Sequence, residues 1–511
     1  MPDNRSLQVP RTVAGLAAAV LLVSLTPAAS IAQPARVMAG ADVTVSAPAH
    51  ARSLTGPADV AIPAVTGPVA HGLVGNESHD YPFASTDPVW LSSHGYVQDE
   101  FFVSGTAGCY ETPRLRTGTV IESGNPYHTR MIVRRPLDRT KSNGVVVVEW
   151  LNASSGYEID STWAATSYEA YIRAGATWVG LSLQNNVIQQ LRTWSPHRYG
   201  ALNVEPRPGS SCPASADTPL TPDNAKVNNL AFDILSQVGR ALRQPAGVDP
   251  LHGLARTTLI ATGASQSAAR LVPYINSVHP VARVYDGFLL AIPIFDHVIR
   301  RDPAFDRLKT PVFKVMSEWD LTVGTVESNN QPDSRALRTW QIAGAPHTTY
   351  QNVQYRIPNN ARDDLPAITF CTGLPPGAEP ISLIPSRYVF AAAAQHLVRW
   401  IRKGTPPPTA PRIGTVPGTT EITRDQYGNA LGGIRLSQHD VATATNNATG
   451  CSTYGWHRPF DQATLATLYP SHRAYVAQVA RVTQRNVRAG YLLQPDARTT
   501  ILEAGQSGIG R

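Results

Sequence analysis

The segment 263–267, Gly-Ala-Ser-Gln-Ser, constrains the fold of this chain more than any other part of the sequence. An apolar run rich in β-branched residues, 256–262, precedes it, and an apolar helical stretch, 268–275, follows it. A serine between a strand and a helix, with small residues two positions before and after it, is typical of a nucleophile elbow. At such a tight turn Ser265 must adopt a strained backbone that exposes its Oγ. Ser265 could instead be an ordinary helix N-cap, because serine is common at that position.

A serine nucleophile needs a base, and the base needs an orienting acid; candidates for both follow Ser265. Two further strand-like runs, 311–317 and 339–344, lead into Asp320 and His347. The chain order of serine, acid and histidine is that of the α/β-hydrolase fold, in which ligands bind at the carboxyl ends of the strands. We therefore predict an α/β fold with a mostly parallel central sheet flanked by helices, in which His347 is the base and Asp320 the acid.

The identity of the acid stays open between several carboxylates. Asp320 lies where the turn after such a strand usually presents its carboxylate, so we favour it over Glu318, two residues earlier. Asp296 follows the preceding strand-like run, 284–293, and is a third candidate. A polar loop is the more ordinary explanation of Asp296 and its neighbour His297.

The substrate carbonyl oxygen, where negative charge develops, requires an oxyanion hole of preorganised N–H donors. The backbone N–H of Gln266, the residue after the nucleophile, is the expected first donor. The second should follow the run 145–151, Val-Val-Val-Val-Glu-Trp-Leu, whose pattern predicts a strand buried on both faces. This run leads into a loop of small residues, and we assign the second donor to the N–H of Ala153 or Ser154.

Motifs along most of the chain carry a family resemblance. They are Gly-Tyr-Val-Gln-Asp-Glu-Phe-Phe-Val-Ser-Gly-Thr-Ala at 95–107, Val-Glu-Trp-Leu-Asn at 148–152, Trp-Val-Gly-Leu-Ser-Leu-Gln at 178–184, the elbow, Ala-Gly-Ala-Pro-His at 343–347, Gly-Gly-Ile-Arg at 432–435 and Tyr-Gly-Trp-His-Arg-Pro-Phe at 454–460. Together they resemble the bacterial alpha/beta hydrolase domain family, over about residues 60–495. The resemblance implies the α/β-hydrolase fold and a secreted serine hydrolase. The chain departs from the family pattern in two places. It has Ser154-Ser155 where a Ser-Gly-Gly type of loop is common, and it has an extended segment near 203–224. These departures bear on substrate preference rather than on catalytic class.

The start of the chain predicts export. Arg5 and Arg11 precede an apolar run, 13–25, and small residues follow at 28–32. This arrangement is typical of a secretory signal peptide, here the first 32 residues, with cleavage after about Ala32. The apolar run is shorter than the ~20 residues that a membrane-spanning helix needs. We expect a secreted, extracellular protein without stable membrane insertion.

After a flexible leader, 33–60, rich in alanine, proline, serine and glycine, we predict one α/β-hydrolase domain over residues 61–495. It carries loop-like insertions at about 185–225 and 350–385, and a C-terminal extension from about 405. Residues 496–511 are expected to form a tail.

Apolar spacing predicts helices over 230–242 and 388–403. Long loops in compact domains are usually functional. In the first insertion Trp194 and Tyr199 could line a pocket, although aromatic residues in loops more often hold the loop in place.

Four cysteines in a secreted chain favour disulfides. Three pairings are possible. We favour Cys371–Cys451, because both lie toward the C-terminus, which leaves Cys109–Cys212.

The remaining patterns narrow the class of function. No Cys-x-x-Cys or His-x-x-x-His spacing and no phosphate-binding glycine loop occurs, so we expect neither a metal nor another cofactor. The net charge of +7 is spread along the chain, which argues against nucleic acid as a partner. We expect hydrolysis of small-molecule or polymeric carboxylic esters through an acyl-enzyme. An extracellular acyltransferase or peptidase with the same triad, and a non-catalytic secreted binding protein, are the alternatives; the oligomeric state is left open.

Overall fold

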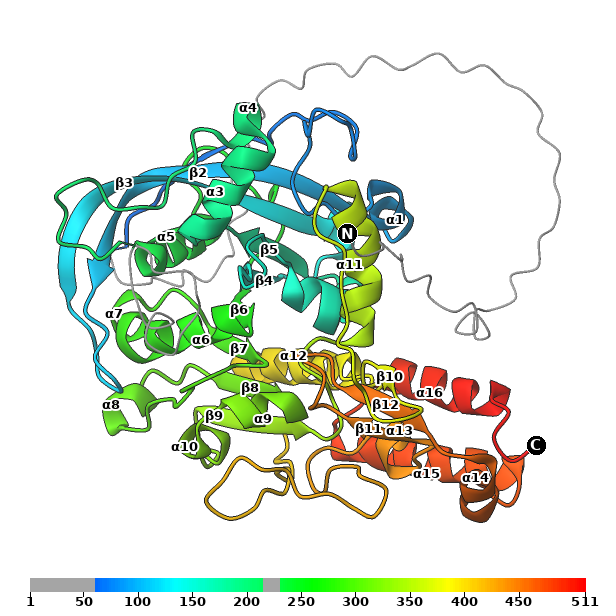
Figure 1. Cartoon of the computed structure of the whole chain (residues 1–511). Helices are drawn as coiled ribbons and strands as arrows, with labels where there is room; N and C mark the ends of the chain where they lie inside the picture. Colours follow the sequence, from blue (N-terminus) through cyan, green and yellow to red (C-terminus); the bar gives the residue numbers. More distant parts are fainter. Residues whose placement is uncertain (1–59, 215–229) are drawn as a thin grey trace, which may run out of the picture. The chain divides into compact units, whose positions relative to one another are not determined.

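A nine-stranded sheet organises the residues that the computed structural model describes, 60–214 and 230–511 (Figure 1). The predicted signal peptide and nearly all of the predicted leader lie outside these residues. The spatial order of the strands is β1-β2-β3-β5-β4-β6-β7-β8-β9. Their bounds are Ala64–Thr66 (β1), Tyr96–Tyr110 (β2), Val120–Pro136 (β3), Val145–Trp150 (β4), Thr177–Leu181 (β5), Thr258–Ala264 (β6), Gly287–Ala291 (β7), Val312–Ser317 (β8) and Leu337–Ile342 (β9).

The sheet has a parallel part and an antiparallel part. All pairings from β5 through β4 to β9 are parallel. The pairings β1–β2, β2–β3 and β3–β5 are antiparallel, and the long β2–β3 hairpin is drawn in blue and cyan in Figure 1. The predicted mostly parallel sheet is therefore present. Its parallel strands end at one edge, which is where residues after β4, β6, β8 and β9 meet.

The most strand-like run of the sequence, β4, is buried on both faces as its pattern predicts. Val146, Val148 and Trp150 belong to one hydrophobic core, and Val145 and Val147 belong to a second core. Successive strand side chains point to opposite faces, so these two cores lie on the two sides of the sheet. A parallel sheet with both faces covered needs strands that present apolar side chains to both of its faces.

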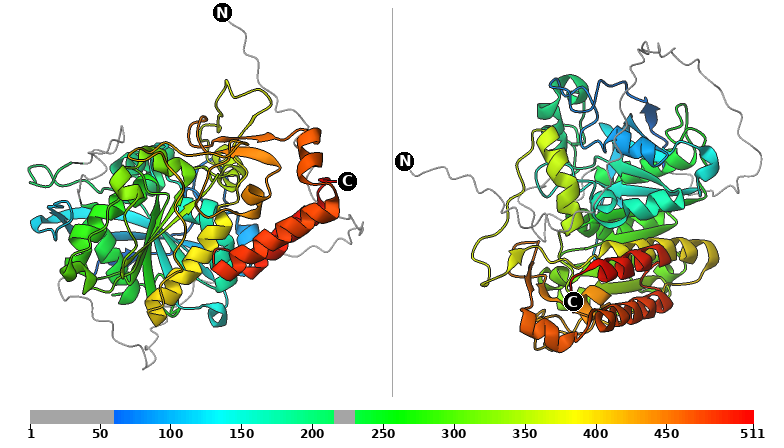
Figure 2. Two further views of the ribbon diagram at one scale, coloured as in Figure 1. Left: turned by 90° about the horizontal axis from the view of Figure 1, so that it is seen from below. Right: turned by 90° about the vertical axis from the view of Figure 1, so that its right-hand side faces the viewer.

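Helices cover both faces (Figures 1 and 2). The first core includes apolar residues of α5 and α6, and the second includes residues of α2 and α12. The helices are Pro88–Ser93 (α1), Tyr168–Ala174 (α2), Asn185–Trp194 (α3), Pro196–Tyr199 (α4), Ala231–Arg243 (α5), Gln266–Pro273 (α6), His279–Ala282 (α7), Pro303–Asp306 (α8), Glu318–Val323 (α9), Val326–Asn329 (α10), Tyr350–Arg362 (α11), Arg387–Lys403 (α12), Ser437–Asp440 (α13), Gln462–Leu468 (α14), His472–Ala489 (α15) and Gln494–Gln506 (α16), with shorter turns at Arg139–Lys141 (η2), Thr162–Ser167 (η3) and Tyr274–Val278 (η5). The described helices include none that is both long and apolar enough to cross a membrane.

The two predicted insertions are not loops throughout. The first begins with α3 and α4, and the second begins with α11. In α4 the proline occupies the first turn, where its missing N–H is harmless. Part of the first insertion, 215–229, lies outside the described residues.

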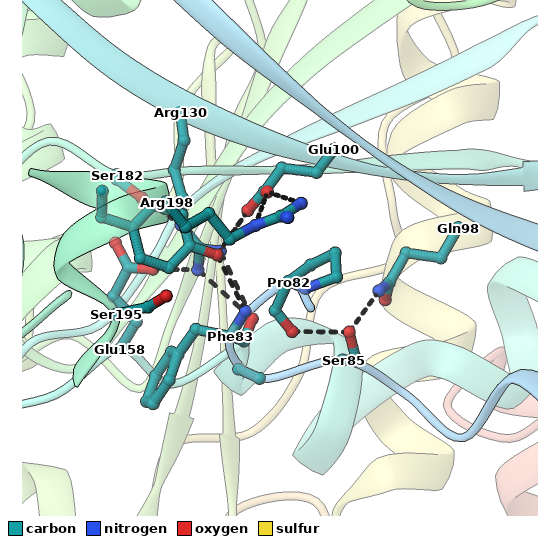
Figure 3. A network of polar contacts seen from close by, with 12 residues as sticks. Pro82, Phe83, Ser85, Gln98, Glu100, Arg130, Glu158, Ser182, Ser195 and Arg198 are labelled. Carbon is teal, nitrogen blue, oxygen red and sulfur yellow. Dashed lines mark hydrogen bonds and ion pairs between the residues drawn. The ribbon is translucent and has the colours of Figure 1, made fainter. Parts of the chain in front are cut away.

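A buried ionic network fixes the first insertion to the sheet (Figure 3). Arg130 of β3 lies 2.7 Å from Glu100 of β2 and 2.5 Å from Glu158, and all three side chains are fully buried. Arg198 and Tyr199 of α4 also bind Glu100, each at 2.7 Å. Each buried charge therefore has an opposite charge beside it, as burial in a low-dielectric interior requires. Tyr199 is fully buried in this network, where it holds the insertion in place.

The C-terminal part adds a second, three-stranded sheet, β10-β12-β11, with strands Glu379–Pro380, Trp456–Pro459 and Ala444–Asn447. Ala497 of α16 belongs to the same hydrophobic core as residues of α12, and Figure 2 shows these helices side by side. The predicted tail, 496–511, differs from the structure, because α16 runs across its boundary and buries Ala497 and Ala504. Apolar residues recur with only weak helical spacing at the end of the chain, so the sequence did not predict this helix.

Both cysteine pairs that we favoured lie at disulfide distance. Cys109 and Cys212 have Cα atoms 5.7 Å apart, and Cys371 and Cys451 have Cα atoms 5.5 Å apart. The first joins β2 to the first insertion, and the second joins the segment after α11 to the loop before β12.

We predict that the protein isolated from an oxidising compartment contains no free thiol. Each bond closes a long loop, of 103 and 80 residues, so its reduction should lower the melting temperature markedly. Thiol titration in denaturant, followed by peptide mapping without reductant, measures this. A peptide that joins Cys109 to Cys371 or Cys451 would contradict the pairing.

Candidate active site

The turn after β6 has the geometry of a nucleophile elbow. Ser265 has φ 60° and ψ −120°, a backbone conformation that residues with a side chain rarely adopt. A Cβ on Gly263 would lie 2.9 Å from the backbone carbon of Ser267, so only glycine fits there. The hydroxyl of Ser267 bonds both the N–H and the carbonyl of Ala264, which explains how serine replaces the usual glycine. Strand and helix therefore approach closely, and Ser265 remains partly exposed between them.

Three predicted residues lie in one hydrogen-bonded row. Ser265 Oγ is 2.8 Å from His347 Nε2, and His347 Nδ1 is 2.6 Å from Asp320 Oδ1. The three residues follow β6, β9 and β8, whose carboxyl ends share one edge of the sheet. With its proton on Nδ1, His347 donates to Asp320 and its Nε2 is free to accept the Ser265 proton. This is the arrangement that a serine nucleophile requires.

Asp320 is held by the first turn of α9. Its Oδ2 accepts the N–H of Ser317 at 2.6 Å, and its own N–H donates to Ser317 Oγ at 3.3 Å, which forms a capping box. The carboxylate is fully buried. Oδ1 is left for His347, so the cap fixes the direction in which the acid faces the imidazole.

The two alternative acids lie elsewhere. Glu318 accepts from the Arg424 guanidinium and from the N–H of Gly344, both at 2.7 Å. Burial raises the pKa of the Glu318 carboxyl, and Arg424 counteracts that shift. Asp296 pairs with Arg114 at 2.9 Å. Among the described residues, neither carboxylate has a contact with His347, so the structure brings Asp320 alone of the three to the imidazole.

The predicted oxyanion donors converge at the same edge but differ in how free they are. Gln266 is the first residue of α6, where an N–H has no acceptor within the helix. The N–H of Ala153 lies 3.3 Å from the side-chain oxygen of Gln266, a long contact. The N–H of Ser154 instead donates to Asn152 Oδ1 at 2.9 Å. Ser154 is thus a poorer candidate than Ala153, because the turn that begins at Asn152 already uses its N–H.

We predict that Asn152→Ala lowers kcat by about 10- to 100-fold with little change in KM. The Asn152 amide donates to the carbonyl of Ala264, next to the nucleophile, at 2.9 Å, so it ties the Ala153 loop to the elbow. Loss of this tie should misplace the oxyanion donor by a fraction of an ångström. Steady-state kinetics on an activated ester measures the effect; an unchanged kcat in a folded variant would contradict it.

Several residues at this edge were not predicted to take part in the site. The Trp319 ring lies 4.6 Å from the His347 ring. Gln184, after β5, exchanges two hydrogen bonds with the Gln266 side chain, of 3.1 and 2.6 Å. Thr453 of the C-terminal part binds the backbone and side chain of Thr348. Gln184 follows a strand and ends the motif at 178–184, and these two features could have indicated its place.

The described residues contain no group of three or more histidine, cysteine, aspartate or glutamate side chains placed to hold a metal ion.

Comparisons with known proteins agree with this architecture. A family model described as alpha/beta hydrolase domain matches residues 65–502. No curated protein matches the chain.

Three of the solved structures that match are distant in sequence. A putative hydrolase from Legionella pneumophila subsp. pneumophila is 10% identical over 39% of this chain and 44% of its own, with a TM-score of 0.22. The poly(3-hydroxybutyrate) depolymerase LpqC from Bordetella parapertussis is 14% identical over 47% of this chain and 88% of its own, with a TM-score of 0.26. An alpha-beta serine hydrolase homologue from Coxiella burnetii is 12% identical over 47% and 91%, with a TM-score of 0.27. The matched region thus spans less than half the length of the Legionella hydrolase. Because the family model covers most of the sequence, it shows that this chain belongs to the alpha/beta hydrolase domain family.

Proposed function

We propose that this α/β hydrolase is a secreted serine esterase that cleaves carboxylic esters through an acyl-enzyme. The observation that carries the proposal is the hydrogen-bonded row of Ser265, His347 and Asp320 at the carboxyl edge of the sheet. A serine at a positive φ, a buried acid and a nearly buried histidine between them are difficult to explain by folding alone.

In the first step His347 Nε2 takes the proton of Ser265 Oγ as that oxygen attacks the ester carbonyl. Charge moves to the carbonyl oxygen, which the N–H groups of Gln266 and Ala153 stabilise, together with the positive end of the α6 dipole. Asp320 stabilises the imidazolium and keeps its orientation. His347 then donates its proton to the leaving alcohol, and the acyl group stays on Ser265 as an ester.

In the second step water attacks the acyl-enzyme. His347 accepts a proton from the water, the same N–H groups stabilise the second oxyanion, and the proton returns to Ser265 as the acid leaves. This scheme uses side chains and backbone groups of the chain throughout.

An extracellular location is part of the proposal. The predicted signal peptide supports it, and so do the two cysteine pairs at disulfide distance, since such bonds persist in oxidising compartments. A small-molecule or polymeric ester outside the cell is the corresponding substrate.

Hydrolysis of p-nitrophenyl acetate and butanoate, with an anilide and a peptide as competing substrate classes, tests the reaction type. We expect turnover of the esters and little of the amides. An acyltransferase with the same triad would give more product when an alcohol acceptor is added, and a peptidase would prefer the peptide. No turnover of any ester would contradict the proposal.

A further inference from the structure

A pocket of about 120 Å³ lies along the face of α6 that begins at Ser265. Ala269 is one helical turn after the nucleophile, since its N–H donates to the Ser265 carbonyl at 2.9 Å. The apolar part of the pocket wall continues from there along α6 and onto the β2–β3 connection and the segment after β7, through Ala269, Val272, Pro273, Leu115, Phe295 and Val298.

An apolar cluster joins this pocket to the base. Ala269 and Ile294 form its buried part, and Phe295, Trp319 and Val323 pack against them. Trp319 also faces His347, with ring centres 4.6 Å apart. Ala269 and Phe295 belong to both the cluster and the pocket wall, so apolar side chains extend from the imidazole to the pocket without a charged residue among them.

Two of the polar side chains in the wall, those of Asn276 and Ser277, are engaged by other parts of the protein. Asn276 donates to the carbonyl of Val298 at 2.8 Å and accepts the N–H of Arg300 at 3.0 Å. Ser277 donates to the carbonyl of Pro113 at 3.2 Å. Between the nucleophile end of the wall and the charged pair of Arg114 and Asp296, a ligand therefore meets mainly hydrocarbon, which suits an apolar group.

The outer end of the pocket is formed by an ion pair. Arg114 lies 2.9 Å from Asp296 and 2.8 Å from Glu327, and its side chain is 51% exposed. These contacts hold the arginine across the end of the wall, where its removal would disturb little of the fold.

The backbone that presents Phe295 is strained. Ile292 and Phe295 have φ values of 44° and 62°, and a β-branched residue at positive φ is a rare outlier. Strain of this kind persists where the surrounding structure enforces it and is concentrated at functional sites. Here it bends the segment after β7 so that Ile294 packs on Ala269.

We propose that this pocket receives the apolar chain of the substrate ester, so that the enzyme favours short to medium chains over acetate and over long chains. The proposal rests on the esterase function proposed above. An apolar cavity of about 150 Å³ holds benzene. The volume here therefore suits a chain of about four carbons.

Two substrate series test the pocket. One varies the acyl chain of p-nitrophenyl esters from acetate to dodecanoate, and the other varies the alkyl group of acetate esters. Each methylene that becomes buried should raise kcat/KM about fourfold, until the pocket is full. From acetate to butanoate the gain is thus about 16-fold. If kcat/KM rises with chain length in the first series, the acyl chain occupies the pocket. If it rises in the second series, the alkyl group of the alcohol occupies it.

Two variants change the pocket in opposite directions. Ala269→Leu fills it near the nucleophile and should reduce the ratio of kcat/KM for butanoate over acetate toward one. Arg114→Ala opens its outer end and should move the optimum to longer chains. Arg207→Ala is the matched control, because Arg207 is 50% exposed and pairs with Glu122 at 3.0 Å away from the pocket. Its chain-length profile should equal that of the wild type.

Wild-type activity that does not depend on chain length in either series would overturn the proposal. In folded Ala269→Leu, an unaltered chain-length preference in the series that rises for the wild type would overturn it too; if that variant does not fold, the Arg114→Ala profile in that series decides. In each case turnover of acetate shows that the esterase function itself stands, whereas no turnover of any ester shows that the proposed function has failed.

Discussion

Ser265→Ala is expected to reduce kcat/KM for an activated ester by roughly 10⁴- to 10⁶-fold and to leave the fold intact. The Oγ of Ser265 is the atom that faces His347 Nε2 at 2.8 Å, so its removal leaves no nucleophile for the base to activate. Alanine is smaller than serine, so it fits into the same narrow turn. Kinetics together with a melting curve separates loss of chemistry from loss of structure.

The chain offers a matched control for this variant. Ser104 lies 2.6 Å from His128 Nδ1, which makes a second serine–histidine pair, on the long β2–β3 hairpin. Ser104→Ala should therefore retain wild-type kcat/KM. If Ser265→Ala keeps more than about a tenth of the activity, the assigned nucleophile is wrong, since loss of a true nucleophile has far larger effects.

Asp320→Asn is expected to lower kcat by about 10⁴-fold, because an amide stabilises the wrong tautomer of the histidine and cannot stabilise its cation. The short contact of Asp320 Oδ1 with His347 Nδ1, 2.6 Å, is the geometric reason. The amide occupies the same volume, so the buried first turn of α9 should keep its shape.

Glu318→Gln is the matched comparison two residues away. Glu318 is also buried, but it pairs with Arg424 and caps the N–H of Gly344. Its amide variant should lower the melting temperature, because it weakens a buried ion pair, and it should retain most of kcat. Kinetics and calorimetry on both variants decide the acid. If Glu318→Gln loses most of its kcat and Asp320→Asn keeps nearly all of it, Glu318 is the acid and Asp320 is not.

Local sequence patterns predicted most of the sheet and the positions of the three aligned residues. The run 145–151 predicted β4 to within one residue, and the run 311–317 predicted β8 equally closely, because runs made mostly of apolar residues fit a strand buried on both faces. The helix expected over 388–403 begins one residue earlier and ends where expected, at Gly404 in a left-handed conformation. The strand before the elbow was placed two residues too early: Gly263 and Ala264 still pair with β7, although glycine is rare in strands.

The surroundings of the site were less predictable, because they depend on contacts between residues distant in the sequence. Gln184 and Gln266 are 82 residues apart, and Thr348 and Thr453 are 105 apart. Spacing along one chain carries no signal for such pairs. Ser154 is a local case, because its N–H donates to the side chain of Asn152, two residues earlier.

Covalent labelling with a fluorophosphonate tests the central claim most directly, since it reports the nucleophile itself. The wild-type enzyme should gain one phosphonyl group per chain, and peptide mapping should locate it at Ser265. Ser265→Ala should remain unlabelled, while Ser104→Ala should be labelled like the wild type. A label on any other residue, or an unmodified wild-type protein after prolonged exposure, would contradict the account.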